Sequence, residues 1–297
     1  MAEVVVAGGT GLLGTALVAA LRASGHRVAV LTRRPTQQGD VLWSPGSSDR
    51  GWTSAIDQAE AVINLAGTSI AGGRWTKARK AAIRESRVQA TRALVQAIAA
   101  ASQPPSVFIS SSAVGVYGTR DDESITEATV PGSDFLASVC CDWETAALEA
   151  TATSRVVLLR TGIVLSREGG ALAQLALPFR FFAGGPLGSG RQYMSWIHVD
   201  DWVAMVQWAL ATASVSGALN VTAPAPVTNA EFARTLGDVL GRPAFVKTPA
   251  FALRLMLGEM ADALVLGGQR VLPDAALKQG FVFQYPTLER ALKQILT

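Results

Sequence analysis

The sequence predicts a doubly wound α/β fold, in which helices cover both faces of a parallel sheet, with a smaller α/β region after it. Short apolar strands alternate with helical stretches through the first half of the 297 residues. Nearly continuous apolar strands that alternate with helices are typical of a parallel sheet buried on both faces. A glycine-rich turn joins the first strand to the first helix. After about residue 165 the alternation gives way to a different composition, which indicates a second unit.

The first strand is expected at Val4–Ala7, where β-branched residues run together. The glycine-rich turn Gly8–Gly14 follows, and Thr15–Ala23 has a helical composition that Ser24 and Gly25 end. Further strands are predicted at Val28–Leu31, Val41–Trp43, Ala61–Leu65, Val107–Ile109 and Val156–Leu159. Helices are predicted at Ser86–Ala101, where apolar residues recur at helical spacing, and over Trp143–Ala150.

The second half begins with a loop predicted at Pro178–Gly190, which is rich in glycine and aromatic residues. A helix over Asp201–Ala211 is expected, with Asp200 or Asp201 as its cap. A short strand at Leu219–Thr222 follows. Thr228 and Glu231 have the spacing of a capping box, which predicts a helix start. From Pro249 on, helices and then a short tail are expected.

Composition excludes several classes of protein. Hydrophobic residues make up 49% and charged residues 16%, so disorder is excluded as the main state. The net charge of +3 comes from dispersed residues, whereas nucleic-acid binders concentrate basic charge in a patch. Two neighbouring cysteines, Cys140 and Cys141, and two histidines give neither a disulfide framework nor a metal site. The lack of a basic leader and of a long apolar run predicts a cytoplasmic protein without a membrane partner.

The glycine-rich turn has the spacing of a dinucleotide-binding loop. It fits G-x-G-x-x-G at Gly9, Gly11 and Gly14, and G-x-x-G-x-x-G at Gly8, Gly11 and Gly14. Glycines let the backbone approach a pyrophosphate, and the helix that follows offers free N–H groups and a partial positive charge. The position between a strand and a helix favours this interpretation over a purely structural turn.

The end of the second strand indicates which dinucleotide binds. NAD-binding proteins place an acid there to hold the ribose 2′-hydroxyl, but this strand ends in Thr32, Arg33 and Arg34, and the next acid is Asp40. A guanidinium binds a 2′-phosphate through charge-assisted hydrogen bonds, whereas a carboxylate repels it. The sequence therefore predicts NADP(H), with Arg33 as its principal ligand. The alternative is a solvated turn charge.

Two later segments carry a resemblance to a known superfamily. Asn64–Gly67 ends the fourth strand, and Ser110–Gly118 is similar to an S-S-x-x-V-Y-G segment with one residue inserted. With these segments the chain resembles the extended short-chain dehydrogenases/reductases. The resemblance implies that 64–67 passes along the adenine ribose and the phosphates. It also implies that a serine, Ser111 or Ser112, holds the carbonyl or hydroxyl of the substrate.

The chain lacks the catalytic pair of that superfamily. Members use Tyr-x-x-x-Lys on one helix, where the lysine lowers the pKa of the tyrosine for acid–base work. None of the three tyrosines here has a lysine four residues on. If Glu144 is aligned with the acid that often follows that lysine, Leu136 takes the tyrosine position and Cys140 the lysine position.

A narrower resemblance covers nearly the whole chain. Its segments include Asp142–Glu144, Arg160–Leu165, Gly184–Gln192, Trp196–Asp201 and Gly267–Pro273. They are similar to atypical extended members labelled nucleoside-diphosphate-sugar epimerases, in the NAD-dependent epimerase/dehydratase family with a C-terminal DUF1731-like domain. The resemblance implies an NADP(H)-binding Rossmann domain and a small substrate domain. The expected boundaries are 1–165 with a return segment at about 196–222 for the first, and 166–195 with 223–297 for the second.

Motif and resemblance together give the expected cofactor-binding residues. Arg87 lies in a segment similar to N-V-x-G-T, which implies contact with the phosphates; a surface helix charge is the alternative. The expected cofactor-binding residues are Gly8, Thr10, Gly11, Leu12, Leu13, Gly14, Thr32, Arg33, Arg34, Leu65, Ala66, Gly67, Arg87, Ser110, Thr161, Gly162 and Ile163.

Candidate catalytic residues are Ser112, Tyr117 and His198, with a structural hydrogen-bonding role as the alternative for His198. Candidate substrate contacts are Trp143, Arg191 and Trp196. Sugar-nucleotide enzymes carry an arginine that grips the diphosphate; this chain has Met194 there, and Arg191 is the candidate substitute.

Two functions are open from the sequence. The first is an NADP(H)-dependent oxidoreductase or epimerase with an altered acid–base set, which acts on a small molecule. The second is a non-catalytic NADP(H) sensor, because the cofactor loop is kept while the tyrosine and lysine are lost. A monomer or a homodimer is expected in either case.

Overall fold

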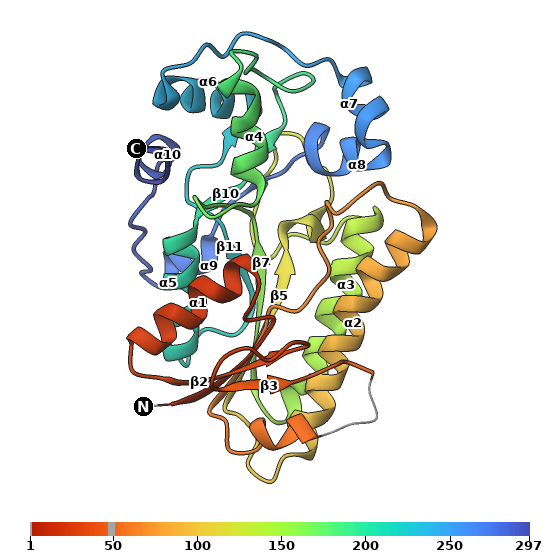
Figure 1. The fold of residues 1–297 in the computed structure, drawn as a ribbon, viewed down its shortest axis with the longest axis vertical. Coiled ribbons are helices and arrows are strands. Elements are labelled where there is room, and N and C mark those ends of the chain that lie inside the picture. The colour runs from red at the N-terminus through yellow and green to blue at the C-terminus, as the bar shows by residue number, and fades with distance from the viewer. Residues whose placement is uncertain (1, 47–50) are drawn as a thin grey trace.

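The computed structural model describes residues 2–46 and 51–297, and its centre is a seven-stranded parallel sheet of order β11-β7-β5-β4-β1-β2-β3 (Figure 1). Every neighbouring pair of these strands is parallel. The strands are β1 Glu3–Ala7, β2 Arg27–Thr32, β3 Asp40–Leu42, β4 Ala61–Asn64, β5 Val107–Ala113, β7 Arg155–Thr161 and β11 Gly217–Val221. The predicted doubly wound fold is confirmed.

Two hydrophobic layers cover the faces of the sheet. Helices α1 (Leu12–Ala23) and α5 (Val199–Ala211) pack on one face, and α2 (Lys77–Ala100) and α3 (Phe135–Leu148) pack on the other. Strand side chains alternate between the two layers, so Ile109 and Phe108 face opposite sides. Apolar residues on both faces explain why these strands lack a polar alternation.

Helix α2 is longer than the sequence pattern predicts. It begins at Lys77, nine residues before the expected start at Ser86, and the Thr76 side chain caps it by accepting from the Arg79 N–H at 3.1 Å. The first turns carry mostly charged and exposed residues. Hydrophobic periodicity therefore could not reveal them.

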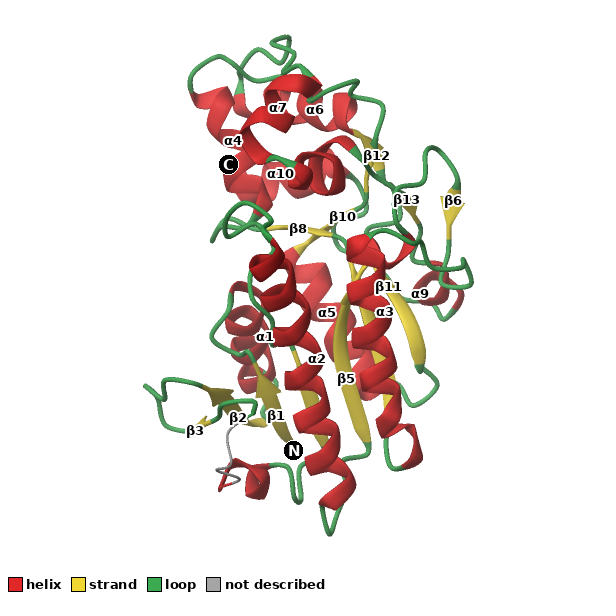
Figure 2. Cartoon of the chain, turned by 90° about the vertical axis from the view of Figure 1, so that its right-hand side faces the viewer, coloured by secondary structure: helices red, strands yellow, loops and turns green. Residues whose placement is uncertain are grey.

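Most of the chain after β7 forms a separate layer above the carboxyl ends of the sheet strands, whereas α5 and β11 belong to the sheet and its cover (Figures 1 and 2). A third hydrophobic cluster, centred on Phe179, Trp196 and Phe232, holds it together. Its helices are α4 Ala171–Arg180, α6 Asn229–Leu240, α7 Ala250–Leu257, α8 Glu259–Ala261 and α10 Leu288–Leu296. Its short strands are β8 Ile163–Leu165, β9 Tyr193–Met194, β10 Trp196–His198, β12 Val227–Thr228 and β13 Arg270–Val271, which pairs with β6 Ser124–Ile125. Helix α9 Asp274–Lys278 instead packs beside β11, where Ala276 joins the first hydrophobic layer of the sheet.

Two expectations for this half are corrected and one is confirmed. Pro178 lies in the last turn of α4, so the predicted loop begins only after Arg180. The chain ends in helix α10 rather than a tail. Leu288, Leu292 and Ile295 form the buried face of α10, which packs against α6. The capping box of Thr228 and Glu231 at the start of α6 is confirmed.

No helix within 2–46 and 51–297 is both long enough and apolar enough to cross a bilayer.

Candidate cofactor and substrate site

The glycine turn is held by very close backbone approaches. Gly8 has φ +81°, and a Cβ there would lie 2.8 Å from the carbonyl carbon of Leu65. A Cβ on Gly14 would lie 2.3 Å from the Gly8 oxygen, and one on Gly9 would lie 2.7 Å from a Val30 methyl. Only glycine lets β1, α1 and the loop after β4 approach this closely.

Gly11 differs from its neighbours because the protein itself does not require a glycine there. Its φ of −79° suits any residue, and a Cβ would make an ordinary 3.5 Å contact with the Gly8 oxygen. The residue is exposed at the mouth of the turn. A glycine at this position leaves room for an external group, which is what a dinucleotide pyrophosphate needs.

The start of α1 offers N–H groups to that external group. Gly11 is the N-cap without a side-chain hydrogen bond, and the first turn carries no acidic residue. The N–H groups of Leu12, Leu13 and Gly14 therefore have no intrahelical acceptor. Thr10 is exposed beside them. Free N–H groups and the helix dipole make this end of α1 suited to a phosphate.

The end of β2 carries two exposed cations. Arg33 and Arg34 form no ion pair with any residue in 2–46 or 51–297. The Thr32 hydroxyl accepts from the Arg34 N–H at 3.2 Å and fixes the turn. Asp40, the first acid after β2, accepts from the N–H groups of Thr36 and Gln37 at 2.7 and 2.9 Å. Its carboxylate closes the loop, so the cationic charge at the end of β2 is not neutralised by it.

The loop after β4 is fixed by hydrogen bonds with two side chains, Asn64 and Arg87. The buried Asn64 donates to the Thr91 hydroxyl at 2.8 Å and accepts from the Ala66 N–H at 3.1 Å. Arg87 donates to the Thr68 carbonyl at 3.1 Å, and its guanidinium carbon lies 3.3 Å from where a Gly67 Cβ would be. Burial lowers the pKa of Arg87. Arg87 thus stands at the expected place beside residues 65–67 and supports their backbone; its contact with phosphates stays a prediction.

The serines at the end of β5 point to opposite faces of the sheet. Ser110 and Ser112 are buried on the side of α2 and α3, and Ser111, between them, turns to the other side. Ser112 is the serine that faces α3, and which of Ser111 and Ser112 holds a substrate stays a prediction. The Ser112 hydroxyl donates to Glu144 at 2.6 Å, so its proton is already engaged.

A buried network of polar side chains lies at the carboxyl ends of β5, β7 and β11. Arg160 donates to both carboxylate oxygens of Glu144 at 2.9 Å and to the Tyr117 hydroxyl at 2.9 Å. Tyr117 donates to Asn220 at 2.7 Å and is fully buried. Burial raises the pKa of Tyr117, against the opposing effect of Arg160. This placement favours a structural role for Tyr117 over the catalytic one expected from the sequence.

The positions of the superfamily's catalytic pair hold an apolar side chain and a thiol. Leu136, in the first turn of α3, lies 3.5 Å from where a Gly115 Cβ would be. Cys140 is buried one turn further on. Burial, reinforced by Glu144, raises the pKa of the Cys140 thiol to about 12. A thiol with so high a pKa stays protonated at neutral pH and is a poor nucleophile or acid.

His198 caps a helix. Its Nδ1 accepts from the Asp200 N–H at 3.0 Å, its Nε2 lies 2.7 Å from the Gln294 side-chain oxygen, and its ring stacks on Tyr285. The expected cap of α5 by Asp200 or Asp201 is wrong. Asp201 instead accepts from two backbone N–H groups of the segment before α10. The fully buried, doubly bonded His198 matches the structural alternative.

The expected substrate contacts do not come together. Trp196 is fully buried in the third cluster and donates to the Ala225 carbonyl at 3.0 Å. Trp143 is also buried and donates to Thr91 at 2.8 Å. These indoles have paired N–H groups and packed rings, so they leave almost no surface for a substrate, and the expectation is corrected for both. Arg191 is exposed in the loop before β9.

Residues 161–163 connect β7 of the sheet to β8 of the second layer. Thr161, Gly162 and Ile163 are half-buried, and a Cβ on Gly162 would lie 2.4 Å from the Ser195 oxygen. Trp202 donates to the Thr161 hydroxyl at 3.2 Å. The backbone of these three residues at the end of β7 is therefore closely packed. Their contact with a cofactor stays a prediction.

The sequence also matches known families. Residues 4–222 match the model described as NAD dependent epimerase/dehydratase family, and residues 248–295 match a domain of unknown function, DUF1731. The chain belongs to the NAD dependent epimerase/dehydratase family. The resemblance inferred from the sequence segments is confirmed.

Members of this family from distant organisms align over the full chain. An epimerase family protein of Mycobacterium leprae is 43% identical over 298 residues, covering 100% of this chain and 96% of the relative. An Arabidopsis thaliana homologue of SDR39U1, described as chloroplastic, is 42% identical and covers 98% of this chain and 86% of the relative. The crystal structure of human SDR39U1 with NADPH is 36% identical, with a TM-score of 0.92, and covers 99% of this chain and 98% of that one.

Proposed function

We propose that this protein is an NADP(H)-dependent oxidoreductase that acts on a small molecule. The observation that carries the proposal is the end of β2, where Arg33 and Arg34 are exposed and the nearest acid is engaged elsewhere. It lies beside a glycine turn with an open Gly11 and a helix start rich in free N–H groups. The presence of NADPH in the human relative supports the same cofactor here.

The residues of this chain fit that cofactor, and the bound group would supply a hydride. The N–H groups at the start of α1 bind the pyrophosphate, and Arg33 binds the 2′-phosphate. Asn64 and Arg87 fix the loop that passes the adenosine half. Ser112 is held by Glu144, so it shapes the site without a free proton to give.

Replacing Arg33 by Ala is expected to weaken NADPH binding by about 10- to 100-fold, because hydrogen bonds to a charged group are worth about 1.5–3 kcal/mol. Binding of NADH, which has no 2′-phosphate, is expected to stay unchanged. Fluorescence titration with both dinucleotides measures the effect. Arg27→Ala, an exposed arginine at the other end of β2, is the control and leaves both affinities as they are. Equal losses for the two dinucleotides would show that Arg33 does not read the phosphate.

A non-catalytic NADP(H) sensor is the second candidate, favoured by Leu136 and Cys140 at the positions of the catalytic pair. A sensor must bind the oxidised and reduced cofactors unequally, because only differential affinity shifts a conformational equilibrium. Equal dissociation constants for NADP⁺ and NADPH would therefore remove this candidate.

Deuteride transfer separates the two functions. The protein is incubated with NADPH deuterated at the nicotinamide C4, as each stereoisomer in turn, and with a small-metabolite extract; mass spectrometry follows the label. The oxidoreductase predicts deuterium in a metabolite. No transfer, with NADPH binding confirmed in the same sample, contradicts the oxidoreductase and favours the sensor.

A further inference from the structure

Arg87 is a half-buried cation without a carboxylate partner. Within the part of the chain that the structure describes, residues 2–46 and 51–297, it belongs to no ion pair. Its Nη1 donates to the carbonyls of Thr68 and Ile83 at 3.1 and 2.9 Å. Burying a charge is costly unless an opposite charge compensates it. Arg87 therefore keeps a positive charge that no described carboxylate neutralises, and this charge acts on any group that binds beside it.

The ionisable groups near Arg87 do not offset its charge. Burial lowers the pKa of Arg87 and the like charge of Arg79 acts in the same direction, whereas Cys140 acts against them. Burial, reinforced by Glu144, raises the pKa of the Cys140 thiol to about 12, so this neighbour is neutral at pH 7. Glu144 itself is paired with Arg160. A guanidinium keeps its proton in proteins, so Arg87 stays positively charged.

Two close approaches connect Arg87 to the glycine turn. A Cβ on Gly8 would lie 2.8 Å from the carbonyl carbon of Leu65, and a Cβ on Gly67 would lie 3.3 Å from the guanidinium carbon of Arg87. Ala66 alone separates Leu65 from Gly67 in the chain. The glycine turn and the guanidinium therefore contact the same short loop, and Arg87 borders the expected cofactor site.

The order of the strands places Arg87 on the nicotinamide side of that site. The order β3-β2-β1-β4-β5 reverses between β1 and β4, and a dinucleotide binds across the carboxyl ends of the strands at such a reversal. Its adenosine end is proposed to lie at β2, where Arg33 follows the strand. The nicotinamide end then lies beyond β4, toward β5. Thr68, which accepts from Arg87, comes after β4.

The Arg87 guanidinium also lies near the positions of the missing catalytic pair. Helices α2 and α3 lie side by side (Figure 2), and the guanidinium carbon is 5.2 Å from the centre of the Trp143 ring. Trp143 follows Cys140, which holds the lysine position of the pair, by about one helical turn. The charge of Arg87 lowers the pKa of Cys140, against the larger effect of burial. A cation is therefore present near this position, but it comes from α2.

The catalytic pair of the superfamily acts beside the nicotinamide ring, because a catalytic acid or base must reach the atoms that react with the hydride. The oxidised and reduced cofactors differ in charge only at this ring. It is positive in NADP⁺ and neutral in NADPH, whereas the phosphates and riboses are the same. Two like unit charges about 10 Å apart, at an effective dielectric constant of about 20, change a binding equilibrium by about 10- to 20-fold.

We propose that Arg87 makes the site selective for the reduced cofactor, because its charge repels the positive nicotinamide ring of NADP⁺ and spares the neutral ring of NADPH. The inference rests on the proposed NADP(H) function and applies to both candidates. In the oxidoreductase, the NADP⁺ that hydride transfer forms leaves and NADPH replaces it. In the sensor, the same difference supplies the unequal binding that a conformational response requires.

Calorimetric titration with NADPH and with NADP⁺ tests the proposal, because contacts to the shared phosphates cancel in the ratio of the two dissociation constants. The wild type is expected to bind NADPH at least about tenfold more tightly than NADP⁺. Arg87→Gln keeps an amide donor for the Thr68 carbonyl but has no charge. In this variant the preference is expected to fall below about threefold, because NADP⁺ is no longer repelled.

Two further variants separate the charge of Arg87 from its other roles. Arg87→Lys keeps the positive charge on a side chain of different shape, and it is expected to keep the wild-type ratio. Arg92→Gln makes the same change in net charge at an exposed position of α2, and it is also expected to keep the ratio. Thermal unfolding shows whether each variant is folded. The wild-type ratio tests the proposal even if Arg87→Gln does not fold.

The possible failures can be told apart. Equal weakening of NADPH and NADP⁺ in Arg87→Gln, with the ratio unchanged, would show that Arg87 binds the shared phosphates, and it overturns the inference while the NADP(H) function stands. Equal affinities of the wild type for the two forms overturn it as well, and so does a lost preference in Arg87→Lys or Arg92→Gln. Binding of neither dinucleotide by the wild type contradicts the NADP(H) function itself, and the inference falls with it.

Discussion

Replacing Arg160 by Met is expected to lower the free energy of unfolding by about 3–5 kcal/mol, because it leaves a buried carboxylate without its partner. Arg160 and Glu144 are joined by two hydrogen bonds of 2.9 Å, and their side chains are 9% and 10% exposed. The same guanidinium also donates to Tyr117 and to the Glu127 carbonyl. Urea unfolding followed by circular dichroism measures the change.

An exposed ion pair provides the control for Arg160. Arg254 and Asp262 are also joined at 2.8 Å, but their side chains are 56% and 55% exposed. Arg254→Met is expected to change stability by about 0–1 kcal/mol, because water screens the pair. In the double variant Arg160→Met with Glu144→Leu, part of the stability is expected to return, since no lone charge stays buried. A loss below about 1 kcal/mol for Arg160→Met would mean that the network does not hold this edge of the sheet.

Replacing Gly14 by Ala is expected to weaken NADPH binding by about 100-fold or more, close to 2.7 kcal/mol. Its Cβ would lie 2.3 Å from the Gly8 oxygen and 2.6 Å from the Gly9 Cα. All these atoms belong to the backbone of the turn, so the turn itself must move away from the start of α1. Overpacking of this kind typically lowers stability by about 1–3 kcal/mol as well.

The two effects of Gly14→Ala are measured by NADPH titration and by thermal unfolding of the free protein. Ala19→Ser, at an exposed position of α1, is the control and is expected to change stability by less than about 0.5 kcal/mol, as helix propensity predicts. Its NADPH affinity is expected to match the wild type. Wild-type affinity in Gly14→Ala would contradict the assignment of this turn to the cofactor.

Local patterns allowed much of the fold to be predicted. The run Val4–Ala7 and the glycine turn define the first strand and helix, because β-branched residues favour strands and the glycine spacing fits one kind of turn. The capping box of Thr228 and Glu231 predicted the start of α6. The helical spacing of Leu288, Leu292 and Ile295 indicates α10, where a tail was expected.

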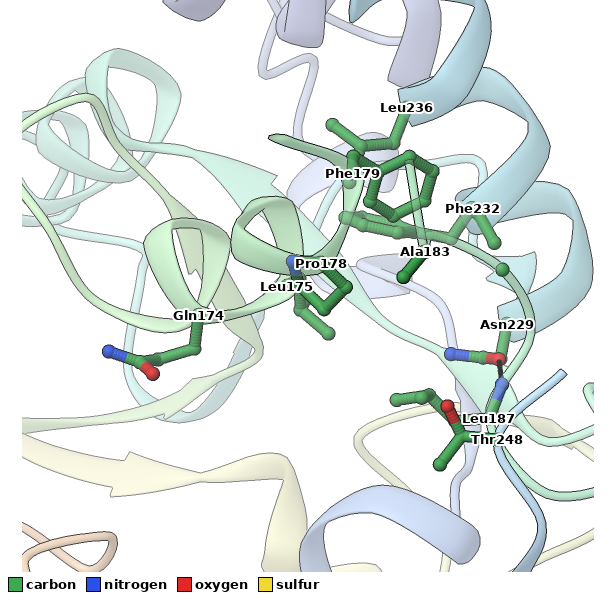
Figure 3. A pocket seen from close by; sticks show the side chains of 12 residues that line it. Gln174, Leu175, Pro178, Phe179, Ala183, Leu187, Asn229, Phe232, Leu236 and Thr248 are labelled. Atoms are coloured by element: carbon green, nitrogen blue, oxygen red, sulfur yellow. Dashed lines mark hydrogen bonds between the residues drawn. The ribbon is translucent and has the colours of Figure 1, made fainter. Parts of the chain in front are cut away.

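The roles of side chains in the site depend on contacts between distant segments. Tyr117 meets Asn220 from 103 residues away, and His198 meets Gln294 from 96 residues away. No local sequence pattern could show that these candidate catalytic side chains are buried and hydrogen-bonded to distant segments of the chain. The cap of α5 was missed because histidine is not among the usual N-cap residues. The pocket between α4 and α6, lined by Phe179 and Phe232 among others (Figure 3), is likewise formed only when these two helices pack.

The measurement that tests the central claim most directly is the affinity of the wild-type protein for NADPH and for NADH under the same conditions. The free cations at the end of β2 predict that NADPH binds at least about tenfold more tightly, as a charge-assisted contact to the 2′-phosphate requires. Equal affinities, or a preference for NADH, would contradict the assignment of Arg33 and the proposed NADP(H)-dependent function.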